Sequence, residues 1–219
     1  MFAGHLGAAL ALGRVERRVN VGVLVVAALL LDVALWAFVL VGRESVTIPA
    51  DFAATHQPVF VFPWSHGLVA SLAWSALAGA AAYLWHAGLR AARTRAAALV
   101  AAAVFSHWLL DALVHVPELP LAGDRSLKVG LGLWQVMPVA LAVEAIVFAA
   151  GLALFLPGSR LSRARAAWLT LVCALVLALT VAGMTVAPPP PSASAMAASS
   201  LGAILAVGAS VGWLGRRSA

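Results

Sequence analysis

Three ionisable residues stand close together inside an otherwise apolar stretch of this chain: His107, Asp111 and His115. At about 100° per residue, His107 and Asp111 share one face of a helix, and His115 follows one turn further on. An ionised side chain at the centre of a bilayer costs at least ~2.5 kcal/mol on insertion scales. A cluster of three therefore needs a partner, which would be a metal ion, a water-filled cavity or opposite charges.

Other apolar runs carry ionisable groups at comparable depth. Counted from the neighbouring basic loops, His5 is ~14 Å deep, Asp32 and His107 are each ~18 Å deep, and Asp111 is ~24 Å deep. His66 enters its apolar run from the opposite end, so tilt or a recessed outer vestibule must bring it down to the others. The site is therefore expected in the outer half of the membrane, open outward.

Imidazole and carboxylate groups in this number suit a divalent ion, with zinc first and manganese or iron as alternatives. Because His115 lies ~12 Å along the helix axis from His107, it would join a second ion or act as an outer acid. Glu144 is the remaining buried carboxylate, which would serve as a second-site ligand, a general base or an orienter of a histidine. The expected metal ligands are His5, Asp32, His66, His107, Asp111 and His115.

The elements that position these residues are expected to be membrane helices. The 219 residues are 63% hydrophobic, with a mean hydropathy of +1.01, which is typical of a single all-α membrane bundle. We expect six spans after a buried, re-entrant or interfacial helix at residues 1–13, which is too short for a ~30 Å core. The expected spans are 20–42, 64–89, 96–116, 129–156, one that ends near 187, and 196–214. Residues 1–156 would form the metal-site core and 157–219 two accessory helices.

The basic residues predict the orientation of these spans. Arg43, Arg125 and Lys128 fall in one set of alternate loops, and all other basic residues fall in the other set. The positive-inside rule then places both termini in the cytoplasm and the large loops outside. The second set comprises Arg14, Arg17, Arg18, Arg90, Arg93, Arg95, Arg160, Arg163, Arg165, Arg216 and Arg217.

The same charge pattern bears on partners. A formal net charge of +6 would suit a nucleic-acid binder, but the basic residues are accounted for by topology, so no nucleic acid is expected. Membrane lipids or a lipid-linked substrate are the expected partners. Gly208 and Gly212 form a GxxxG pattern in the last span, consistent with a homodimer through that helix.

Several short motifs together resemble a known family over roughly residues 1–156. They are His5 in a short first helix, Asp32 in the first span, Trp64-Ser65-His66, Ser106-His107-Trp108-Leu109-Leu110-Asp111, and Lys128-Val129-Gly130-Leu131-Gly132-Leu133-Trp134. This pattern resembles a bacterial inner-membrane family of metal-dependent hydrolases, also described as LexA-binding, inner membrane-associated hydrolases. The resemblance implies a multi-pass protein of the bacterial inner membrane.

That family is in turn distantly similar to the zinc-dependent phospholipase C and single-strand nuclease superfamily, an all-helical fold with a trinuclear zinc site. The resemblance implies a first ion surrounded by Asp32, His66, His107 and Asp111. Asp111 would bridge to a second ion held with His5, and His115 would begin a third site. The superfamily's last His-x3-Asp/Glu pair is missing, because Ala140 stands four residues before Glu144. One or two ions are therefore expected.

Three classes of function follow from these residues. The leading one is a membrane-embedded metal-dependent hydrolase that uses a metal-activated water on a phosphoester of a lipid or lipid-linked substrate. Asp32 would orient or deprotonate that water, Glu144 and His115 would be further catalytic groups, and Lys128 or Arg125 at the outer rim would hold the phosphate. The alternatives are a proton- or metal-coupled transporter and a non-catalytic regulatory membrane protein with a structural metal.

Overall fold

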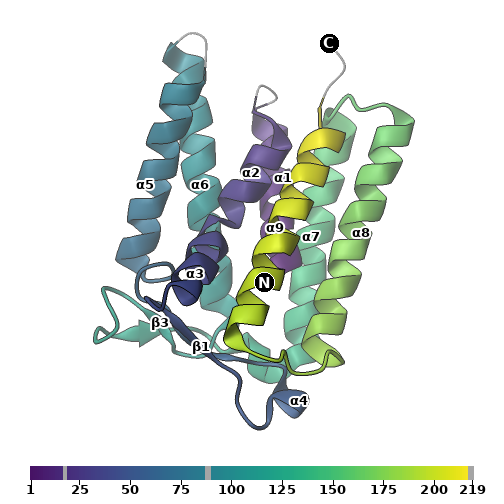
Figure 1. The fold of residues 1–219 in the computed structure, drawn as a ribbon. Helices are drawn as coiled ribbons and strands as arrows, with labels where there is room; N and C mark the ends of the chain where they lie inside the picture. Colours follow the sequence, from purple (N-terminus) through teal and green to yellow (C-terminus); the bar gives the residue numbers. More distant parts are fainter. Residues whose placement is uncertain (17–18, 87–89, 217–219) are drawn as a thin grey trace.

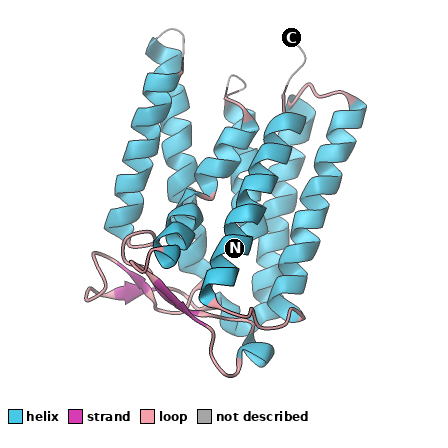
Figure 2. Cartoon of the chain, in the orientation of Figure 1, coloured by secondary structure: helices cyan, strands magenta, loops and turns pink. Residues whose placement is uncertain are grey.

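A computed structural model describes residues 1–16, 19–86 and 90–216 and shows a helical bundle (Figures 1 and 2). The long elements are α1 (Phe2–Val15), α2 (Val21–Ala28), α3 (Leu30–Leu40), α5 (Leu68–Trp85), α6 (Arg90–Val114), α7 (Met137–Gly158), α8 (Arg163–Thr185) and α9 (Ala193–Leu214). The short ones are β1 (Ser45–Thr47), α4 (Phe52–Thr55), β2 (Val59–Val61), β3 (Leu119–Pro120), β4 (Lys128–Val129) and η1 (Leu133–Val136).

Five helical segments of the described residues are long and apolar enough to cross a membrane: α5, α6, η1 with α7, α8 and α9. The bent pair of α2 and α3 makes a sixth if it is counted as one span. Large apolar side chains on these helices are exposed, among them Leu77, Trp85 and Leu171, as lipid contact requires. The expected helical membrane architecture is confirmed, with five or six candidate spans.

The expected continuous span at 20–42 is wrong in its middle. Helix α2 ends at Ala28 and α3 begins at Leu30, and the two helices are bent by 50°. The sequence has no proline or glycine at this point. Instead, the carbonyl oxygen of Ala28 lies 2.7 Å from the imidazole Nδ1 of His107, and a side chain inserted into a helical ladder is a known cause of kinks. The bend leaves Asp32 in the first turn of α3.

Helix α1 runs inside the bundle rather than along its surface. Leu6 and Leu10 are fully buried, and α1 crosses α7 closely because a Cβ at Gly7 would lie only 2.6 Å from the Cα of Phe148. Met1 is also buried, and its amino nitrogen lies 3.4 Å from Asp111 Oδ1. Met1, the terminus that the sequence places in the cytoplasm, thus lies inside the bundle (Figure 1).

The two ends of the bundle differ in structure and charge. At the strand-bearing end, β1 pairs antiparallel with β2 and β3 with β4, within segments expected only as loops (Figure 2). At the opposite, basic end lie the ends of α1 and α5, the starts of α2 and α6, the α7–α8 connection and the end of α9 (Figure 1). The second set of basic residues lies there, except that Arg17, Arg18 and Arg217 fall outside the described residues. Arg90, Arg93 and Arg95, expected in a loop, begin α6.

The two glycines of the GxxxG pattern face the inside of the bundle. A Cβ at Gly22 of α2 would overlap the backbone of Gly212, and a Cβ at Gly208 would lie 2.6 Å from Val26 Cγ2. Small residues allow this close approach of α9 to α2. The surface on which the homodimer expectation rests is thus occupied within the chain.

Candidate metal centre

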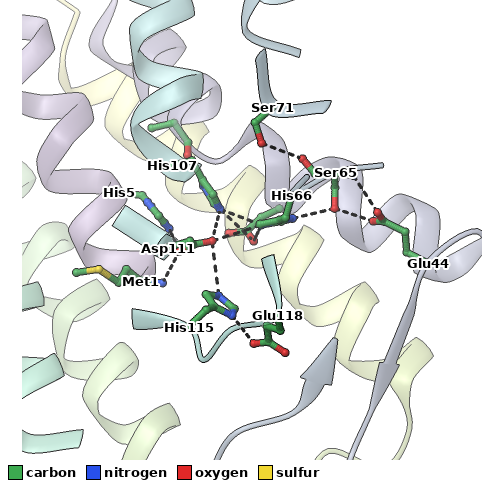
Figure 3. Close-up of polar contacts among 12 residues, drawn as sticks. Met1, His5, Glu44, Ser65, His66, Ser71, His107, Asp111, His115 and Glu118 are labelled. Atoms are coloured by element: carbon green, nitrogen blue, oxygen red, sulfur yellow. Dashed lines mark hydrogen bonds and ion pairs between the residues drawn. The ribbon is translucent and has the colours of Figure 1, made fainter. Parts of the chain in front are cut away.

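Four histidines and two aspartates from separate segments meet inside the bundle, in its half nearer the strand-bearing end. Figure 3 shows the four imidazoles gathered around the carboxylate of Asp111. His5, His107 and Asp111 are at most 2% exposed. The residues that the structure brings together are His5 of α1, Asp32 of α3, His66 just before α5, His107 and Asp111 of α6, and His115 directly after α6.

The carboxylate of Asp111 faces two directions. Its Oδ2 lies 3.1 Å from the Nε2 of His107, 3.5 Å from that of His66 and 3.7 Å from that of His115. Its Oδ1 lies 3.1 Å from the Nε2 of His5. The two oxygens therefore face different imidazoles, which is the arrangement of a carboxylate that can bridge two ions.

Four candidate ligand atoms near His107 have separations close to those of a tetrahedral coordination shell for five of their six pairs. The Nε2 atoms of His66 and His107 are 3.1 Å apart, and Asp32 Oδ1 lies 3.7 Å from each. Asp111 Oδ2 lies 3.1 Å from the Nε2 of His107 and 3.5 Å from that of His66. Four ligands at about 2.1 Å from a tetrahedral zinc ion stand roughly 3.4 Å from one another.

Two groups of three side chains each offer ligand atoms that lie within 4.8 Å of one another. The first is His66, His107 and Asp111, and the second is His5, Asp32 and His107. Three of the four residues expected around a first ion form the first group, whereas the second group joins His5 to Asp32 and His107 instead of to Asp111. Either group could hold a metal ion.

Neighbouring acceptors fix the orientation of two of these histidines. The Nδ1 of His107 lies 2.7 Å from the carbonyl oxygen of Ala28, which can only accept a hydrogen bond. The Nδ1 of His115 lies 2.6 Å from Glu118 Oε1. In both rings the proton on Nδ1 leaves the lone pair of Nε2 directed at Asp111, as a metal ligand requires.

A third histidine is oriented through a relay that the sequence reasoning did not foresee. The Ser65 hydroxyl donates to Glu44 Oε2 at 2.7 Å, so its oxygen accepts from the Nδ1 of His66 at 2.8 Å. Glu44 Oε1 is held by the backbone N–H groups of Trp64 and Ser65. The only local signal was the serine directly before His66, because Glu44 is about twenty residues away in the chain.

The imidazole of His5 is buried, and its two ring nitrogens lack hydrogen-bond partners. Neither nitrogen makes a hydrogen bond, although Nε2 is 3.1 Å from Asp111 Oδ1. The ring stacks on that of His107 with centroids 3.7 Å apart. A buried polar group without a partner costs about 1–3 kcal/mol, and an ion between His5 and Asp111 would supply the missing partner. The residues present thus fit a bound metal.

Glu144 contacts α1 rather than the imidazoles. Its Oε1 accepts hydrogen bonds from the backbone nitrogens of Ala3 at 2.8 Å and Gly4 at 3.2 Å. These belong to the first turn of α1, whose N–H groups lack partners within the helix. The contact joins α7 to the turn that carries His5, so Glu144 positions that histidine.

The two cations expected to hold a phosphate are not brought to the cluster. Lys128 Nζ lies 3.1 Å from Asp124 Oδ1 at the surface of the strand-bearing end. Neither Lys128 nor Arg125 borders the cavity described below. Any contact they make with a substrate would have to occur outside that cavity.

A cavity of about 390 Å³ adjoins the cluster. Its polar lining includes Asp32, His66, Asp111, His115 and Glu144, with His56 and Gln57, and α8 and α9 form much of the apolar side. Trp134 closes over His115 with ring centroids 4.2 Å apart. The cavity gives the cluster access to a ligand with both polar and apolar parts.

The fold and the site define a helical membrane protein with a buried histidine and aspartate cluster. The chain matches no protein family, no curated protein and no solved structure. The cluster and its cavity are therefore the basis for any functional assignment.

Proposed function

We propose that this protein is a membrane-embedded metal-dependent hydrolase that acts on a phosphoester of a lipid or lipid-linked substrate. The observation that carries the proposal is the set of His66 Nε2, His107 Nε2, Asp111 Oδ2 and Asp32 Oδ1, in which five of the six separations run from 3.1 to 3.7 Å, beside a partly apolar cavity. Imidazole and carboxylate ligands suit zinc, with manganese or iron as alternatives.

One ion would be held by His66, His107 and Asp111, with its fourth position open to a water beside Asp32, and a second ion would be held by His5 with the other oxygen of Asp111. A divalent ion supplies a more acidic bound water and polarisation of a phosphoryl oxygen. The buried hydrogen bonds of the three histidines with occupied Nδ1 atoms keep their rings in place before the ligand arrives.

Asp32 and His115 are the groups best placed to handle protons. Asp32, Asp111 and Glu144 all border the cavity. The side chain of Asp32 is 21% exposed while that of Asp111 is 3% exposed, and Glu144 is bonded to α1, so Asp32 is the carboxylate that would accept a proton from water. His115 also borders the cavity and is backed by Glu118 at 2.6 Å. It would donate a proton to the leaving oxygen. In this proposal Glu144 holds α1 in place.

The proposed location is the bacterial inner membrane, with the basic end in the cytoplasm as the positive-inside rule requires. The strand-bearing end then faces outward, and the cluster lies in the outer half of the bundle. A lipid of the outer leaflet would reach it sideways, without crossing the membrane. The charge difference between the two ends of the bundle supports this orientation.

The first test is metal content by mass spectrometry of protein purified in detergent without chelator. We expect about one or two equivalents of zinc in the wild type, and loss of most of it in His107→Ala and Asp111→Ala. The metal-loaded wild type should hydrolyse a phospholipid or a prenyl phosphate. A wild type that retains its metal but hydrolyses neither would refute the substrate assignment. Absence of metal would refute the metal centre and favour a proton-coupled transporter.

A further inference from the structure

The cavity beside the cluster continues between α8 and α9. Its lining there runs from Val176 to Met184 on α8 and from Met196 to Val207 on α9, and neither stretch contains a charged residue. Its polar side chains are those of Thr180 and Ser200, and the Thr180 hydroxyl is already bonded to the carbonyl oxygen of Val176 at 2.9 Å. This part of the cavity, called here the α8–α9 chamber, is therefore suited to hydrocarbon and takes no part in the metal chemistry.

We propose that the α8–α9 chamber holds one hydrocarbon chain of a lipid whose phosphate lies at the histidine and aspartate cluster. The position of the phosphate rests on the proposed function, whereas the position of the chain rests on the chamber alone. The two helices without ionisable residues in their interiors thus become the part of the protein that selects the substrate.

The direction of the chamber matches that of a lipid. Its walls extend for ~12 Å along α8 and ~16 Å along α9 at 1.5 Å per residue. Met184 and Met196 lie next to the α8–α9 turn at the strand-bearing end, and Val176 and Val207 lie nearer the middle of the bundle. A lipid in the leaflet at that end has its phosphate outermost and its chains pointing to the membrane centre.

The chamber is open to the side. Leu179 is 62% exposed although it lines the cavity, and Gly183 and Ala203 are also exposed lining residues. A chain that slides in from the bilayer exchanges one apolar environment for another, so the chamber orients the lipid more than it adds affinity. At about 390 Å³ the whole cavity is small for a ligand site, which suits one chain and leaves a second chain in the bilayer.

One substitution can fill the chamber without disturbing its walls. A Cβ at Gly183 would meet no atom within 4 Å, so the side chain of Gly183→Leu has room to project into the chamber. Gly202 of α9 provides the matched control. It also has nothing within 4 Å of a Cβ but does not line the cavity. Both variants replace a helical glycine by a good helix former.

The test uses the full chain in lipid vesicles with a long-chain alkyl phosphate that carries a photoreactive diazirine. With the diazirine at the chain end, we expect adducts around Val176 and Val207, and with the diazirine beside the phosphate, around Met184 and Met196. Gly183→Leu should reduce these adducts at least tenfold and Gly202→Leu should not. Both variants should keep the wild-type metal content and thermal stability.

Equal labelling of wild type and Gly183→Leu, or adducts confined to lipid-facing residues such as Leu171, would overturn the proposal. The labelling does not depend on turnover, so it is informative even if the protein hydrolyses nothing. Conversely, hydrolysis of a short water-soluble phosphoester with no chamber labelling would leave the proposed enzyme standing and remove the chain site.

Discussion

The close crossing of α1 and α7 allows the metal centre to be tested from outside it. Gly7 lies two residues beyond His5 and has no room for a side chain, because a Cβ there would stand 2.6 Å from both Phe148 Cα and the carbonyl oxygen of Val147. Both atoms are backbone and cannot swing away. Gly7→Ala must therefore move α1 as a body away from α7.

The size of this movement can be worked out. Carbon atoms in good contact stand about 3.5–4.0 Å apart, so a contact of 2.6 Å requires α1 to move by roughly 1 Å. Metal–ligand distances tolerate only about 0.2 Å. The His5 ring would thus be withdrawn from the ion it shares with Asp111. Overpacking of this kind also costs typically 1–3 kcal/mol of stability.

The assay is metal content together with the temperature of unfolding, in detergent. We expect Gly7→Ala to lose metal from the His5 position and to unfold at a lower temperature. Gly151→Ala should do the same from the opposite helix, because its Cβ would overlap the carbonyl oxygen of Gly7. Gly202→Ala, which meets no atom, is the control. Full metal content in both Gly7→Ala and Gly151→Ala would show that His5 is not a ligand.

Four further outcomes are expected. Ser65→Ala should weaken metal binding by about 10–100-fold in a competition titration, because the His66 ring loses its support; Ser75→Ala, on the same side of the bundle, should have no effect. Glu144→Gln should retain most hydrolysis and stability, since an amide oxygen still accepts hydrogen bonds from α1. Glu144→Ala should cost about 1–3 kcal/mol of unfolding free energy. If Glu144→Gln loses turnover but retains its metal, Glu144 acts as a catalytic base instead. Lys128→Ala should change the hydrolysis rate by less than about twofold, because its ion pair is exposed and outside the cavity. Chelation should lower the unfolding temperature of the wild type but not of His107→Ala.

The part of the site that lies on one helix was predictable from the sequence. His107 and Asp111 are four residues apart, so any helix through them places both on one face. The meeting of these two with His66 and Asp32 also followed, because each is an ionisable group in an apolar run and must find a partner. The sequence could not show how these residues reach the same depth along the bundle axis. The bend after Ala28 and the inward course of the loop before α5 bring them there.

The contacts that hold His66 and helix α1 in place could not be predicted from the sequence, for a physical reason. Glu44 and Glu144 act on residues about 20 and 140 positions away. Apart from the Ser65 hydroxyl that donates to Glu44, their partners are backbone N–H groups, which nearly every residue has. Nothing in the sequence marks one N–H group as the partner. The bend between α2 and α3 likewise lacks a local signal, since its cause is a carbonyl contact made by His107 from another helix.

The chamber was hidden for a different reason. Helices α8 and α9 were expected to be accessory because they carry no ionisable residues in their interiors. In a membrane protein, positions that face lipid and positions that line a chamber for a hydrocarbon chain are both occupied by apolar residues. Gly183 and Gly202 illustrate this, because both are helical glycines in apolar runs and only the first lines the cavity. Only the positions of the neighbouring helices separate the two cases.

Charge balance links the number of ions to the kind of substrate. Asp32 and Asp111 together carry two negative charges, and the imidazoles with an acceptor on Nδ1 present a neutral Nε2. The Met1 ammonium, 3.4 Å from Asp111 Oδ1, supplies one positive charge. A buried carboxylate without a cation costs several kcal/mol in a medium of low polarity, so one divalent ion would complete the neutralisation and leave an excess of one positive charge. A second ion, shared by His5 and Asp111, would raise that excess to three positive charges beside the cavity. An anionic phosphoester is the ligand that such a site would then require, and its hydrocarbon chain would extend into the α8–α9 chamber.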